Sequence, residues 1–400
     1  MQFLFDDYRL DPDRRELWHG GEPVPTEPQV FDLLVCLMQN RERVLSKDDL
    51  IANVWKGRIV SDATLTSRIN AARNAIGDTG KEQRLIKTVM RKGIRFVGAV
   101  NESDGASAAP AAEVAGTPAA RPTLRQQIQF CTAPDNVRIA YADVGAGPPL
   151  VKAANWLNHL EYDWESPVWK PLLHALATDH RLVRYDERGT GLSDWDPQEI
   201  SVDSFVRDLE SVVDSLGLDR FPLLGMCQGG ATAVTYAARH PERVSRLVIV
   251  GGYARGTLKR KPIDAEQFEA LMTLARHGWG HDNPAFRQIF TYQFIPGGTT
   301  EQVCWFNDLM KETASPQNAV RIMRAMADFD VEDLLPRIKV PTLVLHCRND
   351  ARVPWEEGRR IATGIPGARF VTLEGHNHIV LESEPAWAGL LDEIRSFLND

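Results

Sequence analysis

Phe221-Pro222-Leu223-Leu224-Gly225-Met226-Cys227-Gln228-Gly229-Gly230 is the stretch that decides the fold of the longer part of this chain. It joins a short apolar run to the small-residue, helix-forming run 231–238, and it has the pattern Gly-x-nucleophile-x-Gly of a nucleophile elbow. The nucleophile of an elbow lies on a sharp turn, so its neighbours two positions away must be small, as Gly225 and Gly229 are. Cys227 occupies the position at which serine is usual. A glycine-rich loop with a buried cysteine is the alternative interpretation of the stretch alone.

Apolar runs of strand length alternate with helical stretches on both sides of the elbow. This alternation predicts a mostly parallel sheet covered by helices on both faces. In such sheets the functional groups gather at the carboxyl ends of the strands. The predicted strands are 150–153, 180–185, 222–225, 247–251, 342–346 and 370–373.

Two candidate partners of Cys227 follow it in the chain. Asp350 lies in the turn of His346-x-x-x-Asp350-x-x-Val353-Pro354, directly after a predicted strand. His378 falls seven residues before Pro385, and His376 is its rival because Gly-His is the commoner dipeptide. We favour His378 on spacing. Each histidine has the alternative of a surface position or a position behind the site.

The elbow, Asp350, His378 and the strand alternation together resemble the α/β-hydrolase superfamily over residues 123–400. The resemblance implies a catalytic triad of Cys227, His378 and Asp350. It also implies an oxyanion hole made by the backbone N–H groups of Trp156 and Gln228. Trp156 lies in the loop Ala154-Asn155-Trp156-Leu157, where the superfamily carries His-Gly-x, so the residue types here depart from the pattern.

The insertion at about 253–330 has helical patterning of its own and resembles a lid over the pocket. Its aromatic residues, with two tryptophans below it, indicate an apolar ligand pocket. We expect most of these aromatic side chains to serve packing and only a few to line a ligand. The predicted pocket residues are Asn155, Trp156, Trp164, Met226 and Trp305.

A cysteine at an elbow is chemically coherent as a nucleophile, because a helix N-terminus and a histidine both favour the thiolate. Cys-His-Asp is also the combination of the dienelactone hydrolases that this position resembles. It could attack an ester, lactone or thioester, and a slowly hydrolysed acyl thioester would suit a sensor. Two other accounts remain open: Cys227 only shapes a non-covalent pocket, or it is a redox switch with Cys347 as its resolving thiol.

Residues 1–100 are predicted to form a small α+β domain. Two short strands open it, and three helices follow, starting at Thr26, at Ser46 and at Ser61 or Asp62. A strand pair at 85–90 and 94–97 closes it. Five basic residues and no acidic one lie between Arg84 and Arg95, a local excess suited to phosphate contacts.

This domain resembles the winged-helix DNA-binding domain of OmpR-type transcriptional regulators. The matching residues are Thr26 with its helix, Leu45-Ser46-x-x-Asp49-Leu50-x-x-x-Val54-Trp55, Val60-Ser61-Asp62-x-Thr64-Leu65 and Ile86-x-Thr88-Val89-x-x-x-Gly93-Ile94-x-Phe96. The resemblance implies that 62–76 is the recognition helix in a major groove and that 91–93 is the tip of the wing in a minor groove. A surface helix with an ordinary hairpin is the alternative. The candidate DNA-binding residues are Thr64, Thr66, Ser67, Arg68, Asn70, Arg73, Asn74, Arg91, Lys92 and Arg95.

Residues 101–122 hold eight Ala, three Pro and two Gly and are predicted to be a flexible linker. The charge is uneven along the chain. Residues 1–100 hold 16 Lys+Arg and 14 Asp+Glu, while the remainder holds 30 and 40. The five cysteines are scattered and odd in number, which argues against disulfides and a zinc site. With no signal-peptide pattern and no membrane-spanning run, we expect a cytoplasmic protein without metal or cofactor.

Two functional hypotheses follow. The first is a one-component, ligand-responsive transcriptional regulator that binds double-stranded DNA as a homodimer and detects a small apolar, acyl, ester or lactone molecule at Cys227. The second is an active Cys-dependent ester or lactone hydrolase with an accessory DNA-binding domain. Fold alone does not decide between them.

Overall fold

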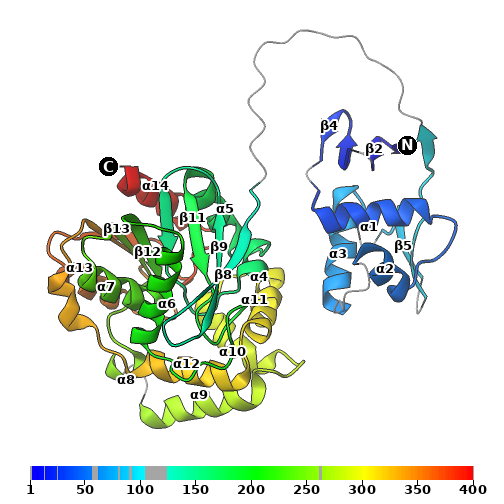
Figure 1. Ribbon diagram of the computed structural model, residues 1–400. Coiled ribbons are helices and arrows are strands. Elements are labelled where there is room, and N and C mark those ends of the chain that lie inside the picture. Colours follow the sequence, from blue (N-terminus) through cyan, green and yellow to red (C-terminus); the bar gives the residue numbers. More distant parts are fainter. Residues whose placement is uncertain are drawn as a thin grey trace, which may run out of the picture. The chain divides into compact units, whose positions relative to one another are not determined.

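The computed structural model describes residues 2–12, 14–24, 26–55, 62–79, 82–89, 92–103, 124–260 and 264–399. The chain divides into two compact units, residues 1–119 and 120–400 (Figure 1). The predicted fold classes of both units are confirmed.

The sheet of the first unit is antiparallel and has the strand order β4-β3-β2-β1-β7. Its strands are β1 (Gln2–Phe5), β2 (Tyr8–Asp11), β3 (Glu16–His19), β4 (Glu22–Pro23) and β7 (Asn101–Ser103). Strand β7 lies inside the stretch predicted to be linker. It carries no apolar residue that could signal a strand, and its pairing with β1 is what makes it one. Residues 104–122 of the predicted linker lie outside the described residues.

Three helices and a hairpin complete the first unit: α1 (Pro28–Gln39), α2 (Lys47–Val54), α3 (Asp62–Ala75), β5 (Ile86–Val89) and β6 (Gly93–Phe96). A reciprocal capping box at Ser46 and Asp49 starts α2, as the sequence predicts. The predicted N-cap of α1 is wrong. Glu27 holds that position because a proline follows at the first helical residue, and the Thr26 hydroxyl donates instead to the carbonyl of Val24 at 2.9 Å.

The second unit is built on an eight-stranded sheet with the order β15-β14-β13-β12-β10-β11-β9-β8. Its strands are β8 (Gln127–Thr132), β9 (Arg138–Val144), β10 (Pro149–Lys152), β11 (Arg181–Tyr185), β12 (Phe221–Met226), β13 (Val244–Val250), β14 (Thr342–Cys347) and β15 (Arg369–Leu373). The strands from β10 to β15 run parallel, while β8 and β9 form an antiparallel edge. The sequence prediction located the six parallel strands and missed this edge.

Neighbouring side chains along the central strands point to opposite faces and enter two separate cores. Leu224, for example, belongs to the core on one face and Leu223 to the core on the other. The core with Leu224 is covered by α5 (Lys170–Asp179) and α14 (Ala386–Asn399). The core with Leu223 is covered by α6 (Val202–Ser215), α7 (Gly229–Arg239) and α13 (Trp355–Gly364). Two short segments, α4 (Leu160–Trp164) and the 3-10 helix Glu332–Arg337, join these elements.

A helical insertion lies between β13 and β14, where the sequence predicts a lid. Its helices are α8 (Thr257–Arg260), α9 (Ala265–Gly278), α10 (Ala285–Phe294), α11 (Thr300–Thr313) and α12 (Pro316–Asp328). Helices α9 and α12 pack side by side (Figure 1). They bring aromatic and methionine side chains over the carboxyl end of β12, and this arrangement encloses the candidate site. None of the described helices has the length and apolar character needed to cross a membrane.

Candidate active site

Cys227 lies on the turn between β12 and α7, in a backbone conformation that non-glycine residues rarely adopt, with φ of +51°. The turn requires glycine on both sides. A Cβ at Gly225 would lie 2.8 Å from the carbonyl oxygen of Gly229, and a Cβ at Gly229 would lie 2.5 Å from that of Ala154. The local sequence therefore builds the sharp elbow that exposes a side chain at the end of the strand.

The structure brings Cys227, His378 and Asp350 together. The thiol and the imidazole are hydrogen-bonded, and Nδ1 of His378 lies 2.7 Å from Oδ2 of Asp350. Oδ1 of Asp350 accepts from the backbone N–H groups of Arg352 and Val353, both at 2.8 Å. The acid is thus fixed by the turn in which the sequence places it.

The rival histidine lies elsewhere. A Cβ at Gly297 would come within 2.6 Å of Nε2 of His376, which places that ring against the loop before α11. Beside His378, in contrast, a Cβ at Gly251 would approach Cε1 to 3.1 Å. The backbone after β13 therefore leaves room for the His378 ring.

The three groups shift one another's pKa. Burial alone would raise the pKa of Cys227, but the charge of His378, its hydrogen bond to the sulfur and the charge of Arg352 outweigh burial and lower it. Burial alone would lower the pKa of His378, but Asp350 and the thiolate raise it to about 10. The same charge of His378 holds the pKa of Asp350 well below its ordinary range against the effect of burial. This pattern favours a thiolate–imidazolium pair.

The predicted oxyanion hole holds an internal acceptor. The backbone N–H of Trp156 donates a hydrogen bond to Oε1 of the Gln228 side chain. The backbone N–H of Gln228 itself points at the Cys227 sulfur, whose thiolate it stabilises. Of the two predicted donors, one is therefore engaged by a side chain of the elbow, which the sequence argument about backbone groups did not foresee.

Buried ionisable groups hold this side chain in place. Nε2 of Gln228 donates to the carboxyl group of Glu187 at 3.1 Å. Burial, followed by the charge of Asp208, raises the pKa of Glu187 to about 8, so the neutral acid dominates at pH 7. Lys152 donates to Oδ1 of Asn155 beside the same loop, and burial together with Arg184 lowers its pKa to about 8.

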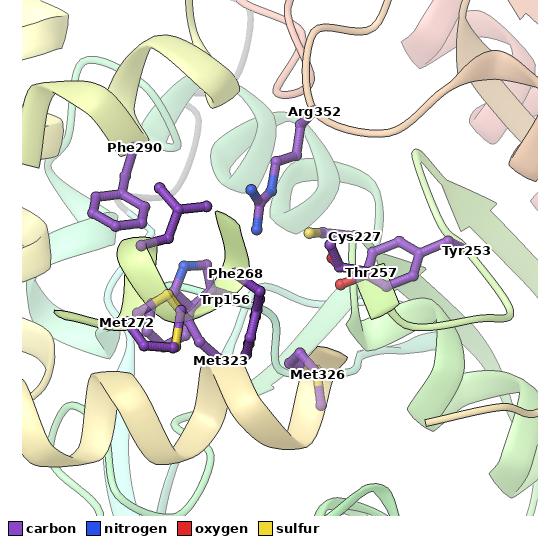
Figure 2. A pocket seen from close by; sticks show the side chains of 11 residues that line it. Trp156, Cys227, Tyr253, Thr257, Phe268, Met272, Phe290, Met323, Met326 and Arg352 are labelled. Atoms are coloured by element: carbon purple, nitrogen blue, oxygen red, sulfur yellow. The ribbon is translucent and has the colours of Figure 1, made fainter. Parts of the chain in front are cut away.

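A cavity opens beside the thiol, beneath the lid (Figure 2). Its volume is about 50 Å³, room for a few water-sized groups, so the reacting end of a ligand in this state is small. Its lining residues are Trp156, Cys227, Tyr253, Thr257, Phe268, Leu271, Met272, Phe290, Met323, Met326 and Arg352. The guanidinium group of Arg352 points into it near Cys227 (Figure 2).

Of the five predicted pocket residues, only Trp156 is among those lining residues. Asn155 is buried behind the loop, and Met226 is buried in the core. Trp164 packs against His174 at 4.3 Å between ring centroids, and Trp305 stacks on Tyr162 at 5.1 Å. These four residues do not line this cavity, because closeness in sequence to the elbow or the insertion does not decide which way a side chain points.

The redox account of Cys227 finds little support in Cys347. Both cysteines are free and buried. Burial, with the charge of Asp350, raises the pKa of Cys347 to about 12, so it would rarely supply a resolving thiolate. No group of three or more His, Cys, Asp or Glu side chains within the described ranges could hold a metal ion.

In the first unit, the structure separates the candidate DNA-binding residues. Arg73 is buried, and its guanidinium group donates to the carbonyl of Ile86 at 3.1 and 3.2 Å and to Oγ1 of Thr88 at 2.9 Å. It joins α3 to the hairpin, so its assignment to the DNA-facing surface is corrected. Arg68 is ion-paired with Glu27.

Asn70, Asn74, Lys92 and Arg95 are exposed. Arg95 lies directly opposite Lys87 on the neighbouring strand, and both are exposed. Two like charges that face each other repel and weaken a hairpin. An anion such as a DNA phosphate would relieve this repulsion, so the pair favours an anionic partner. The side chains of Thr64, Thr66 and Ser67, and the whole of Arg91, lie outside the described residues.

Several residues at the site carry no signal that the sequence argument used. The Gln228 side chain, Glu187 and Arg352 all act through contacts between segments far apart in the chain. His346 supports the acid from the same segment, because its Nε2 lies 3.4 Å from Oδ2 of Asp350 and 3.0 Å from the carbonyl of Val353. Arg352 alone had a usable signal, since it follows the candidate acid by two residues in the same turn.

Comparison with known families agrees with this division of the chain. Residues 156–385 match the family model described as alpha/beta hydrolase fold. Residues 21–96 match the model described as Transcriptional regulatory protein, C terminal. The second match implies DNA binding by the first unit.

Individual relatives match the second unit. The putative carbamate hydrolase RutD of Rhizobium rhizogenes is 27% identical over 229 residues, covering 54% of this chain and 82% of the relative. The AB hydrolase superfamily protein YisY of Bacillus subtilis is 29% identical over 260 residues, covering 61% of this chain and 90% of the relative. An esterase from Exiguobacterium antarcticum shares the fold with a TM-score of 0.57 and 24% identity, over 68% of this chain and 99% of that one. An enol-lactonase from Burkholderia xenovorans also shares the fold, with a TM-score of 0.56 and 22% identity, over 68% of this chain and 100% of that one.

Proposed function

Because this chain belongs to the alpha/beta hydrolase fold family and carries a DNA-binding regulatory domain ahead of that fold, we propose that it is a one-component transcriptional regulator. In this proposal the hydrolase-fold unit detects a small apolar, acyl, ester or lactone molecule in the cavity at Cys227. Binding or acylation there changes how the first unit binds double-stranded DNA.

The observation that carries this proposal is the contact between Gln228 and Trp156. A free oxyanion-hole donor accelerates acyl transfer by about 10²–10³, and here the Trp156 N–H is engaged by an internal acceptor. The triad supplies a reactive thiolate, while the hole that would drive turnover is partly filled. Such a site suits detection of a ligand better than rapid hydrolysis.

The chemistry at the thiol follows from the hydrogen bonds. The Cys227 sulfur attacks the carbonyl carbon of an ester, a C–S bond forms and the C–O bond to the alcohol breaks. His378 gives its proton to the departing alkoxide, and Asp350 holds the imidazole by Nδ1. The product is a thioester on Cys227 and a free alcohol. Attack by water on the thioester breaks the C–S bond, releases the carboxylic acid and returns the thiol.

Deacylation is the step that we expect to be slow. It develops a second oxyanion, and the Gln228 amide competes for the Trp156 N–H at that moment. A long-lived acyl thioester then marks exposure to the ligand. A non-covalent ligand in the same cavity would act through the lid side chains alone.

The test measures acylation and DNA binding on the full chain. Intact-mass spectrometry after exposure to p-nitrophenyl acetate and p-nitrophenyl butyrate should show one acyl group on the wild type and none on Cys227→Ala. Fluorescence anisotropy with a mixed-sequence DNA duplex should show that acylation changes the affinity. No adduct, together with unchanged DNA binding in the presence of either ester and in Cys227→Ala, would contradict the proposal.

A second candidate function is a working cysteine hydrolase. The hydrogen-bonded Cys227, His378 and Asp350 favour it, and so do the hydrolase names of the relatives. Multiple-turnover release of p-nitrophenol that Cys227→Ala and His378→Ala both abolish would support it. Ligand-dependent DNA binding that survives those two changes would support the regulator.

We also expect a homodimer, because winged-helix regulators commonly bind paired half-sites and a two-fold symmetric protein matches them. We expect its interface on the second unit rather than on the segment between the units. Sedimentation equilibrium of the full chain and of residues 124–400 measures this. A monomeric full chain, free and on DNA, would contradict the expectation.

A further inference from the structure

Arg352 brings a positive charge into a cavity that is otherwise mostly apolar. It lines the cavity beside Cys227, and its guanidinium group points inward (Figure 2). Nη1 donates to Oε1 of Gln293, and the guanidinium carbon lies 5.2 Å from the centre of the Phe294 ring. Within the described part of the chain it forms no ion pair with a carboxylate. An amide and a ring leave most of its five N–H donors for another acceptor.

Arg260 brings a second positive charge against two residues that line the cavity. Its guanidinium carbon lies 4.5 Å from the centre of the Tyr253 ring, and Tyr253 lines the cavity. Nη2 donates to Oγ1 of Thr257, another lining residue, at 3.3 Å. Nε and Nη1 are buried and have no hydrogen-bond partner in the described part of the chain. Burying guanidinium donors without an acceptor is costly, so a ligand that supplies one would be favoured.

The acids near Arg260 are already engaged. Glu357 lies 3.3 Å from Arg255 and 3.6 Å from Arg360. Glu332 bonds the same two arginines, at 3.6 and 2.9 Å. Two acids and two arginines thus form one network, and the charge of Glu357 also acts on Arg260, which makes no ion pair of its own within the described residues.

Positive charges gather around the thiol. Cys227, His378 and Asp350 together carry one negative charge, whether their shared proton lies on sulfur or on the imidazole. Arg352, Arg260 and Lys152 are all close enough for their charges to act on the Cys227 sulfur. These cations favour a ligand that carries a negative charge.

We infer that the ligand of this pocket is a small apolar carboxylate, whose carboxylate group is bound by Arg352 with Arg260 as the second cation. The planar guanidinium group of arginine matches a carboxylate with two parallel hydrogen bonds, which gives selectivity over a neutral amide. The apolar body then lies against the lid side chains Phe268, Met272, Phe290, Met323 and Met326. This inference rests on the proposed function, because it takes the cavity to be a ligand site.

The test compares matched acids and amides on the full chain by isothermal titration calorimetry. The probes are butyrate and hexanoate against butyramide and hexanamide, at pH 7 and constant ionic strength. We expect each acid to bind at least about tenfold more tightly than its amide, since hydrogen bonds to charged groups are stronger than those between neutral groups. Arg352→Gln should weaken the acids by about ten- to a hundredfold and leave the amides unchanged. Arg260→Gln should produce a smaller loss of the same kind.

Arg348→Gln is the matched control. Arg348 precedes Arg352 in the same turn, is ion-paired with Glu374 at 3.0 Å and is more than half exposed, so its loss should not alter the preference for acids. Circular dichroism melting curves of all three variants establish that they fold. Acids and amides that bind equally well to the wild type would overturn the carboxylate assignment and leave the cavity as a ligand site.

Two further outcomes would show that Arg352 serves only the thiolate, or that the cavity is not a ligand site. If Arg352→Gln slows alkylation of Cys227 by iodoacetamide but keeps the preference for acids, Arg352 serves the thiolate alone and the inference is wrong. If neither series binds and p-nitrophenyl acetate leaves no adduct on Cys227, the proposed function fails together with the inference.

Discussion

The side-chain oxygen of Gln228 accepts the hydrogen bond that the backbone N–H of Trp156 donates, although the two residues lie 72 positions apart in the chain. Trp156 follows β10 and Gln228 starts α7, so the contact joins the two segments that would bind the oxygen of a reacting carbonyl. A ligand carbonyl must displace the Gln228 amide to reach that donor. The contact therefore links ligand binding to the buried group Glu187, which holds the other end of the amide.

Replacing Gln228 by methionine should turn the site toward hydrolysis. Methionine has a similar length and no oxygen acceptor, so the Trp156 N–H becomes available to an oxyanion, while the backbone N–H of residue 228 is kept. We expect the steady-state release of p-nitrophenol from p-nitrophenyl acetate to rise by about tenfold or more. Gln198→Met, at an exposed position, is the control. A fall in rate with normal folding would show that the Gln228 side chain assists the reaction.

The thiol of Cys227 should react with iodoacetamide at lower pH than a free cysteine does. The charge of His378 and its hydrogen bond lower the pKa of Cys227 against the opposing effect of burial. In His378→Ala the charge and the hydrogen bond that lower the pKa of Cys227 are gone, so burial raises that pKa. The pH at which alkylation is half-maximal should then move above that of a free thiol, and the rate at pH 7 should fall by roughly tenfold.

This experiment uses intact-mass spectrometry between pH 5 and 10. Exposed Cys304 and partly buried Cys131 are replaced by serine in both proteins to lower the background label. Identical pH profiles with and without His378 would contradict the assignment of the ion pair.

The pair Asp350–His378 should stabilise the second unit over a defined pH window. Asp350 has a lowered pKa, so its contribution is present above the unfolded value of about 4 and is lost as pH falls. His378 has a pKa raised to about 10, so its contribution is complete below about 6.5 and is lost as pH rises through about 10. Asp350→Asn should therefore cost about 3 kcal/mol between these limits, and less at both ends.

Urea unfolding followed by tryptophan fluorescence measures this difference. Eight of the ten tryptophans lie between residues 124 and 400, so the signal reports mainly on the second unit. Glu393→Gln, which removes the partner of Arg369 on the surface, is the comparison and should change stability by less than about 1 kcal/mol. A cost of Asp350→Asn that is constant from pH 4 to pH 11 would contradict the linkage.

In the first unit, substitutions should separate stability from DNA binding. Arg73→Met removes buried hydrogen bonds to Ile86 and Thr88 and should cost about 2–4 kcal/mol of unfolding free energy. Lys92→Ala and Arg95→Ala should leave stability within about 0.5 kcal/mol, and each should reduce the slope of log affinity against log salt by about one. Thermal unfolding and anisotropy titrations at several salt concentrations measure the two effects. A salt slope unchanged by both substitutions would remove the hairpin from the interface.

Sequence reasoning succeeded where burial imposes a pattern. The six parallel strands are apolar runs because both faces of the sheet are covered, and the elbow is legible because its geometry excludes larger residues. Strand β8 was missed because it lies at an edge and is largely exposed, including Phe130 at 60%. An edge strand of this kind carries no continuous apolar run.

The errors at the site have a common physical cause. Arg73 was assigned to the DNA-facing side of α3, yet it follows buried Ala72 and reaches a carbonyl that only the folded hairpin supplies. The engagement of Trp156 by Gln228 likewise depends on two loops meeting. A side chain of this length can either extend into solvent or bind a group that is far away in the sequence. Because the local sequence does not contain that group, it does not predict which of the two occurs.

Arg73 also bears on how this regulator can change its target over evolution. Since its guanidinium group ties α3, the predicted recognition helix, to the hairpin of β5 and β6, the predicted wing, the angle between these two elements is set inside the protein. On the same helix, Oδ1 of Asn70 accepts a hydrogen bond from Nη1 of Arg73 at 3.3 Å, whereas the exposed side chain of Asn74 makes no such bond within the described residues. We therefore expect that a new operator can be acquired by exchanging bases within a half-site, while the distance between its predicted major-groove and minor-groove contacts stays fixed for as long as Arg73 is kept.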